Sequence, residues 1–315
     1  MICYLLSKIF IILNEFSYTE RIHMTRIFTY NIDMNYSSIE EFLRQKGYSH
    51  HIMTHLKRTE RGIVHNGDWA YSSAALVPGD RLVITLTEDA CSENILPAPV
   101  PFEIVYEDED LMIINKPSNT PVHPSVNNYG NTLANGLAWH FAQKKENFVY
   151  RCINRLDRDT SGLLIIARHA LSAALLSSMV ASRNICREYL AVAAGSVPHC
   201  GIIDAPIARE AGSAITRCVD FERGERAVTH YKCLSRRDGC SLVRLRLETG
   251  RTHQIRVHMK YLGYPLLGDY LYNPDYRIMK RQALHSARLS FDHPVTGIKM
   301  DFTAPLPDDM EWIMK

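Results

Sequence analysis

The chain of 315 residues is long enough for more than one domain, and 46% of its residues are apolar, so it can bury a full hydrophobic core. Its formal net charge is only +2, so a nucleic acid would have to be bound by local basic clusters rather than by the whole surface. The eight cysteines are scattered without a Cys-x-x-Cys pair, which favours reduced thiols and predicts a cytoplasmic protein. The sequence contains no glycine-rich phosphate loop, dinucleotide fingerprint or His-Glu-x-x-His motif.

Residues 1–30 carry the weakest structural signal. Residues 2–13 are apolar, but the run is too short to cross a membrane and Lys8 interrupts it. The segment also lacks the basic start and the small-residue cleavage site of a signal peptide. We interpret residues 1–30 as an extension, disordered or not translated, with Met24 as an alternative start. A short helix docked on the core is the other interpretation.

Residues 31–89 predict a small separate α+β domain. A first helix is expected after a serine cap at position 37 or 38, and a second helix from about 49 to 59. The Asn66-Gly67 pair then follows a short apolar run, which is a strong signal for a β-hairpin. An alternating strand after residue 80 completes the unit.

Alternate prolines at 97, 99 and 101 predict a stiff, extended linker over residues 90–101. The second domain then spans 102–315. Its predicted elements are a hairpin over 102–115, a helix over 133–143, a doubly buried strand over 162–167, a helix over 170–182, and strands at 187–192, 242–247 and 300–304, the last of which would close the domain.

A dense charged loop runs directly into the buried strand at 162–167. It contains Arg155, Asp157 and Asp159 within a few positions. Such a loop places carboxylates and guanidiniums on a rigid support beside the core, which is where a catalytic group is held best. The alternative is a surface turn with ion pairs.

A second polar block, residues 248–258, follows the alternating strand at 242–247. It carries four basic or imidazole side chains, which suit an anionic ligand. A solvated basic helix face is the alternative. The four residues are Arg251, His253, Arg256 and His258.

These segments resemble the signatures of the RNA pseudouridine synthases of the RluA type. The resemblance rests on Arg155-Leu156-Asp157 followed by Thr160-Ser161-Gly162, and on the block at 248–258. It extends over roughly residue 102 to the C-terminus. It implies an α/β (α+β) catalytic domain built on a mixed, largely antiparallel sheet, with an active cleft between 151–161 and 248–258. One departure lies beside the first motif, where Asn154 replaces the usual His.

The resemblance also implies roles for individual residues. Asp157 corresponds to the catalytic nucleophile, and Arg251 to the arginine that pairs with it. Tyr189 would stack on the reacting base and serve as a candidate base for the C5 proton. Arg155 would fill the space that a flipped nucleotide leaves, and Ile255 would form an apolar wall.

The unit at 31–89 resembles the S4-type RNA-binding domain, in which Arg44, Lys57 and Arg58 would meet phosphates. A plain solvated helical pair is the alternative. The expected function is therefore isomerisation of specific uridines to pseudouridine in structured RNA, above all large-subunit ribosomal RNA, by a monomer that binds no membrane. Because the reaction is redox-neutral, no metal and no small-molecule cofactor is expected.

Three alternatives stay open at this point. Transfer RNA could be the substrate instead of ribosomal RNA. The chain could also be a catalytically silent RNA-binding protein, although Asp157, Tyr189 and Arg251 are all retained. A glycoside hydrolase using Asp157 and Asp159 would explain neither the block at 248–258 nor the S4-like unit.

Overall fold

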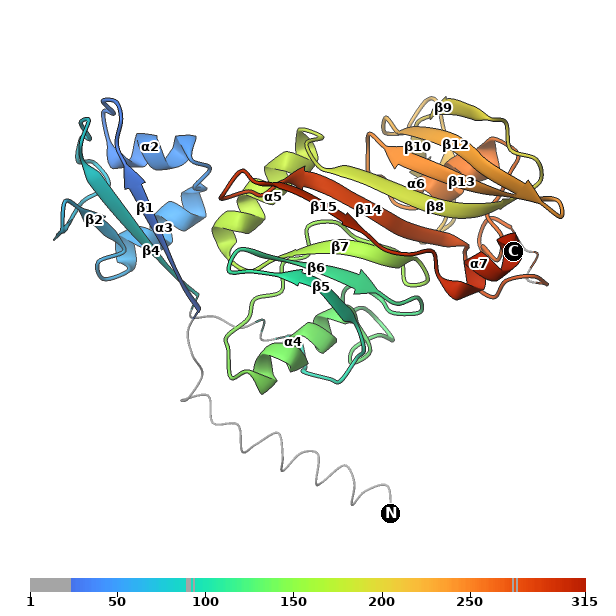
Figure 1. The fold of residues 1–315 in the computed structure, drawn as a ribbon, viewed down its shortest axis with the longest axis horizontal. Coiled ribbons are helices and arrows are strands. Elements are labelled where there is room, and N and C mark those ends of the chain that lie inside the picture. Colours follow the sequence, from blue (N-terminus) through green and yellow to red (C-terminus); the bar gives the residue numbers. More distant parts are fainter. Residues whose placement is uncertain (1–23, 89–91, 93, 274, 276) are drawn as a thin grey trace, which may run out of the picture.

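The computed structural model describes residues 24–315 apart from 89–91, 93, 274 and 276 (Figure 1). Within these residues the largest sheet has nine strands in the order β5-β6-β7-β14-β8-β13-β12-β9, with β15 paired to β14. Only β7 and β14 pair in parallel, so the predicted mixed, largely antiparallel sheet is confirmed. The strands are β5 (Glu103–Glu107), β6 (Leu111–Lys116), β7 (Ser161–Ala167), β8 (Cys186–Ala194), β9 (Cys200–Asp204), β12 (Val228–Arg237), β13 (Cys240–Leu247), β14 (Leu284–Asp292) and β15 (Lys299–Thr303).

Helices pack against both faces of the sheet around β7; Figure 1 labels them α4 (Leu133–Gln143), α5 (Ala170–Ala181) and α6 (Gln254–Tyr261). Strand β7 is buried along its whole length, as its apolar sequence predicted, because Leu164 and Ile166 face one cluster and Leu163 and Ile165 the other. The first cluster includes helices α4 and α6, and the second includes α5. The charged loop before β7 is thus anchored to the centre of the core.

The N-terminal unit has its own sheet, in the order β1-β4-β2-β3, and its own apolar cluster. Serine side chains cap both of its helices, and the cap of the first, Ser38, is one of the two positions that the sequence predicted. One expectation is wrong: residues 24–30 are not an extension, because they form most of β1 and pair along β4. The rest of that prediction, residues 1–23, lies outside the described residues. The elements are β1 (Met24–Asn31), α2 (Ile39–Gln45), α3 (His50–Arg58), β2 (Ile63–His65), β3 (Asp68–Trp69) and β4 (Arg81–Glu88).

Ion pairs and apolar packing join this unit to the nine-stranded sheet and its helices. Arg26 of β1 donates to Asp110 over 2.8 Å, and Arg151 donates to Glu88 over 2.8 Å. Leu171 of α5 packs into the apolar cluster of the N-terminal unit. Because charged and apolar contacts both cross the boundary, the two parts meet in a defined interface.

Two further expectations can be compared with the structure. The residues of the proline-rich stretch 90–101 that are described form neither helix nor strand, in agreement with a linker. Strand β15 does not close the domain, because α7 (Asp308–Met314) follows it. A short ribbon, β10 (Ile207–Arg209) with β11 (Arg217–Val219), was not predicted.

Within the described ranges, none of the helices is both long and apolar enough to span a membrane.

Candidate active site

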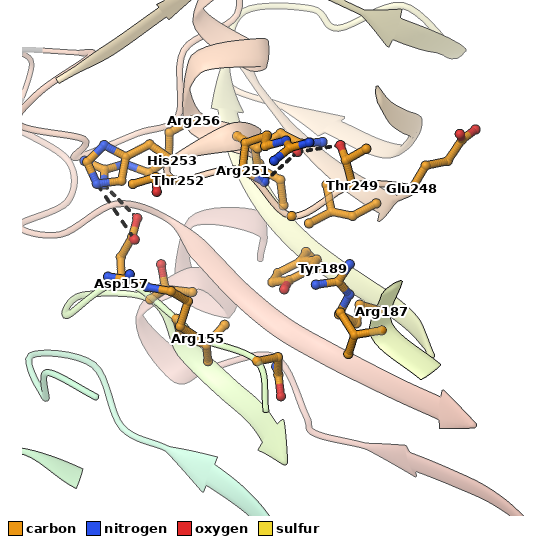
Figure 2. A pocket seen from close by; sticks show the side chains of 18 of the residues that line it. Arg155, Asp157, Arg187, Tyr189, Glu248, Thr249, Arg251, Thr252, His253 and Arg256 are labelled. Carbon is orange, nitrogen blue, oxygen red and sulfur yellow. Dashed lines mark hydrogen bonds and ion pairs between the residues drawn. The ribbon is translucent and has the colours of Figure 1, made fainter. Parts of the chain in front are cut away.

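A cavity of about 430 Å³ opens between the charged loop, strand β8 and the start of α6 (Figure 2). Its walls come from 153–160 and from 247–256, so the predicted cleft between these two segments is confirmed. All five residues predicted for the catalytic centre line it. They are Arg155, Asp157, Tyr189, Arg251 and Ile255.

The partner of Asp157 is Arg256, not Arg251. The Arg256 Nη1 donates to Asp157 Oδ2 over 2.8 Å, while its Nε and Nη2 hold both oxygens of Asp269 at 2.8 Å. The Arg251 side chain instead donates to the Arg226 carbonyl and pairs with Glu225. The predicted pairing of Arg251 with Asp157 is therefore wrong.

The position at which α6 begins explains why Arg256, and not Arg251, contacts Asp157. Helix α6 begins at Gln254, so Arg256 lies in its first buried turn and only 2% of its side chain is exposed. Arg251 precedes the helix, and 41% of its side chain is exposed at the rim. The two arginines therefore extend to different sides of the same short segment, as Figure 2 shows.

Arg256 is a permanent positive charge beside the carboxylate. Burial alone would lower its pKa, but the contacts with Asp269 and Asp157 more than offset this and raise the pKa above its ordinary value. The guanidinium joins two carboxylates from distant segments, at 2.8 Å each. It thus fixes the orientation of Asp157 and stabilises its negative charge.

His253 also lies near Asp157 but carries no charge at neutral pH. Burial is the main cause that lowers its pKa, and its Nδ1 is 2.9 Å from the Tyr272 hydroxyl. Its Nε2 lies 3.8 Å from the Asp157 carboxylate, beyond hydrogen-bond distance. His253 adopts a left-handed backbone with φ of 57°, which turns the chain into α6.

Buried polar contacts hold the Asp157 loop in place. The fully buried Lys116 donates to the Arg158 carbonyl over 3.0 Å, and burial lowers the pKa of Lys116 to about 7. The Asn154 side chain accepts from the Ile165 backbone N–H over 2.8 Å, so the residue that departs from the family pattern ties the loop to β7. The loop is therefore rigid on both sides of Asp157.

Tyr189 and Ile255 form the apolar part of the cavity. Their side chains come from β8 and α6, and they are 5% and 4% exposed. Burial raises the pKa of Tyr189, so its phenol is protonated at neutral pH. Arg155 is exposed and lies where this cavity meets a second one of about 850 Å³, which also reaches Asp157.

The three basic residues predicted for the N-terminal unit lie on its helical surface. Glu40 binds both Arg44 and Lys57 over 2.8 Å. Arg58 forms no ion pair with any residue that the structure describes. None of the three lines the cavity around Asp157.

One group of side chains has metal-ligand spacing, with ligand atoms of Asp108, Asp110 and His293 within 4.8 Å of one another. Asp110 already accepts from Arg26 over 2.8 Å and lies 2.8 Å from a His169 nitrogen. His293 contacts Asp108 over 3.0 Å. The group is therefore an internal polar network at the boundary with β1, with its acceptors in use.

Several residues of the site carried little signal in the sequence. Asp269 and Lys116 lie outside the two polar segments, 151–161 and 248–258, that the sequence marks. Arg187 is only the first residue of the strand predicted at 187–192, yet it lines the cavity and is 9% exposed. The direction of the Arg256 side chain could have been inferred from its position in α6. That inference requires the first residue of the helix, and helix ends are the least certain part of a prediction from sequence.

Comparison with known proteins gives concordant matches. The family model described as RNA pseudouridylate synthase matches residues 110–261. An uncharacterised RNA pseudouridine synthase of Bacillus subtilis, YjbO, is 40% identical over 279 residues, covering 88% of this chain and 98% of that protein. The ribosomal large subunit pseudouridine synthase D of Zymomonas mobilis is 38% identical, covering 84% and 90%. Among solved structures, human RNA pseudouridylate synthase domain containing 1 matches with a TM-score of 0.55 and 26% identity, covering 66% and 84%.

Proposed function

The chain belongs to the family of RNA pseudouridine synthases, and from this premise we propose that it converts specific uridines of large-subunit ribosomal RNA to pseudouridine. As a member of this family it is an isomerase. The choice of RNA is supported by relatives that are named ribosomal large subunit pseudouridine synthase D, at 38% identity over most of the chain. The observation that carries the proposed chemistry is the Asp157 carboxylate, which a buried guanidinium holds at the edge of the cavity that Tyr189 and Ile255 line.

The reaction breaks the bond between uracil N1 and ribose C1′ and joins C5 to the same carbon. A carboxylate near C1′ can act as a nucleophile, as in a retaining glycosidase. Asp157 is suited to this role because the guanidinium of Arg256 orients it, while 23% of its side chain stays exposed to the cavity. Asp159 does not share the role, since Arg158 binds both of its oxygens.

Tyr189 supplies the surface on which the target base stacks, with Ile255 opposite as an apolar contact. Because burial raises the pKa of the phenol, Tyr189 accepts the C5 proton only if it first loses its own proton. Arg155 is exposed at the mouth of the cavity, next to Asp157 in the loop. It fills the space that the flipped nucleotide vacates. Flipping the nucleotide out of its stack costs roughly a few kcal/mol.

The N-terminal unit acts as an S4-like RNA-binding domain in this proposal. Its two capped helices present Arg44, Lys57 and Arg58 on an exposed surface. Glu40 neutralises part of that charge, so Arg58 is the strongest candidate for a phosphate contact.

The test uses RNA from cells that lack the protein, probed for pseudouridine by carbodiimide treatment and reverse transcription. The strain is complemented with the wild type, with Asp157→Asn or with Asp159→Asn as the matched control. The expected result is a stop in ribosomal RNA that vanishes in the deletion strain and returns with the wild type and Asp159→Asn only. A stop that vanishes from transfer RNA instead would move the substrate to that class. No change at any position, or full activity of Asp157→Asn, would contradict the proposal.

A further inference from the structure

Arg187 carries a buried guanidinium for which none of the described residues supplies a partner. Its side chain is 9% exposed, and its Nε is enclosed without a hydrogen-bond acceptor. Within the described part of the chain it has neither a hydrogen bond nor an ion pair. The other arginines of the same cavity that carry such pairs are Arg183 with Glu248, Arg251 with Glu225, and Arg256 with Asp157. A buried, unpaired charge carries a large desolvation penalty, so its retention inside a cavity points to a ligand that supplies the missing acceptor.

Arg187 lies on the cavity side of strand β8, two residues before Tyr189. The two side chains share one face of the strand, about 7 Å apart along it. In the view of Figure 2, Tyr189 lies between Asp157 and Arg187. The charges of Arg187 and Asp157 both act on the Tyr189 hydroxyl, in addition to its burial. Arg187 therefore forms the wall of the cavity that faces Asp157 across the tyrosine.

The guanidinium is held close to the turn before α6. A Cβ built on Gly250 would lie 3.0 Å from the Arg187 Nη1, tighter than an ordinary contact. The absence of a side chain at Gly250 thus leaves the room in which Arg187 extends.

The position of Arg187 indicates which part of the substrate it would contact. A uridine with C1′ beside Asp157 and its ring on Tyr189 directs the far edge of the base toward Arg187. That edge carries carbonyl oxygens, whereas the phosphates are attached to the ribose on the Asp157 side. A guanidinium offers five N–H donors and no acceptor, which matches carbonyl oxygens.

We propose that Arg187 donates hydrogen bonds to the carbonyl edge of the target uracil and stabilises the negative charge that the base acquires during the reaction. The inference rests on the proposed function. When the N1–C1′ bond breaks, its electron pair stays on the uracil and is shared over N1, O2 and O4. C5 then bonds to C1′ and loses its proton, and N1 gains a proton, so no co-reactant is consumed. Arg187 transfers no proton, because its guanidinium stays charged throughout.

The same contact would discriminate between pyrimidines. Cytosine carries an amino group in place of the C4 carbonyl of uracil. This amino group is a hydrogen-bond donor, so it cannot accept from the N–H groups of Arg187. A site that leaves buried polar groups unpaired rejects such an analogue strongly. Arg187 is therefore expected to contribute to the choice of uridine over cytidine as well as to the rate.

The test compares purified wild type with Arg187→Gln and Arg187→Lys, on an RNA fragment that contains the mapped target uridine. Arg288→Gln is the control, because this arginine lies outside the cavity and pairs with Asp301 on the surface. Circular dichroism and thermal unfolding identify which variants fold. Arg187→Gln should lower the single-turnover rate at saturating RNA by about 10²-fold, as loss of an oxyanion donor does, with Kd changed little. Arg187→Lys should fall between Arg187→Gln and wild type, and it carries the test if Arg187→Gln does not fold.

Binding to the same fragment with cytidine at the target position is the second measurement. The wild type should prefer uridine, and Arg187→Gln should lose most of this preference. An unchanged saturating rate with weaker binding and a salt slope lower by about one would assign Arg187 to a phosphate and overturn the inference. Wild-type activity of Arg187→Gln with an intact uridine preference would overturn it as well. No pseudouridine from the wild-type enzyme would instead refute the proposed function, and the inference with it.

Discussion

Exchange of Arg256 for methionine should destabilise the protein far more than the same exchange at Arg251. Methionine keeps an unbranched apolar stem of similar reach and removes the charge. In Arg256→Met the fully buried Asp269 loses two contacts of 2.8 Å and Asp157 loses one. Breaking a buried pair from one side costs about 3–5 kcal/mol, because the remaining charge stays uncompensated.

The matched variant Arg251→Met removes a pair at the surface. The side chains of Arg251 and Glu225 are 41% and 68% exposed. Solvent screens such a pair, and its removal costs about 0–1 kcal/mol. Both arginines come from the block at 248–258, so the difference in stability between the two variants reports burial and pairing rather than membership of the motif.

Urea denaturation followed by circular dichroism at neutral pH gives the free energy of unfolding of both variants. Arg256→Met should lose at least about 2 kcal/mol more than Arg251→Met, taking the lower bound for the buried pair and the upper bound for the surface pair. Equal losses, or a larger loss for Arg251→Met, would refute the assignment of Arg256 as the partner of Asp157. The double variant Arg256→Met with Asp269→Asn should recover part of the loss, since the stranded carboxylate is then gone.

Three other perturbations have expected outcomes. Burial alone would raise the pKa of Asp110, but hydrogen bonds from a buried histidine and an arginine of β1 hold it below its ordinary value. The stabilisation is therefore present above about pH 4 and is lost as the pH falls, so thermal unfolding of Asp110→Asn should differ most from wild type at neutral pH and least near pH 3. Gly162→Ala places a Cβ against the backbone of Ser286 at φ of 107° and should cost about 3 kcal/mol or more in urea denaturation, whereas Gly212→Ala, which meets open space, should cost about 1–2 kcal/mol. Arg58→Ala should weaken RNA binding uniformly and lower the salt slope of Kd by about one; an unchanged slope would remove Arg58 from the RNA surface.

The elements with continuous apolar signals were predictable from the sequence. Strand β7 is buried on both faces because every residue from Gly162 to Ala167 is small or apolar. Helix α4 has the predicted bounds, Leu133–Gln143, and Thr132 caps it with a reciprocal contact to Asn135. Here local propensity and the global fold agree, which makes sequence reasoning effective.

The missed elements have weak local signals. Strand β1 is an edge strand whose burial alternates, but Arg26 lies on its inward side and Ile27 on its exposed side, so the alternation is hidden in the sequence. Helix α7 has no side-chain cap at Pro307, and buried Met310 and the contact of Asp309 with Arg281 hold it in place. Both elements are thus fixed by distant contacts that a linear sequence does not display.

The candidate site divides in the same way. Asp157 and Tyr189 could be placed because short motifs carry them. The choice between Arg251 and Arg256 depends on where α6 begins, and the unpaired state of Arg187 depends on which carboxylates of the cavity are already taken. The local sequence does not reveal these contacts, because several of the partners lie tens of residues away in the chain.

Release of tritium from RNA labelled at uridine C5 reports directly whether Asp157 carries the reaction, because the C5 hydrogen must leave when C5 bonds to C1′. Purified wild type and Asp157→Asn would be incubated with large-subunit ribosomal RNA that carries this label. We expect tritiated water from the wild type and none from Asp157→Asn, with both proteins folded and bound to the RNA. Equal release by both proteins would contradict the role of Asp157 as the nucleophile.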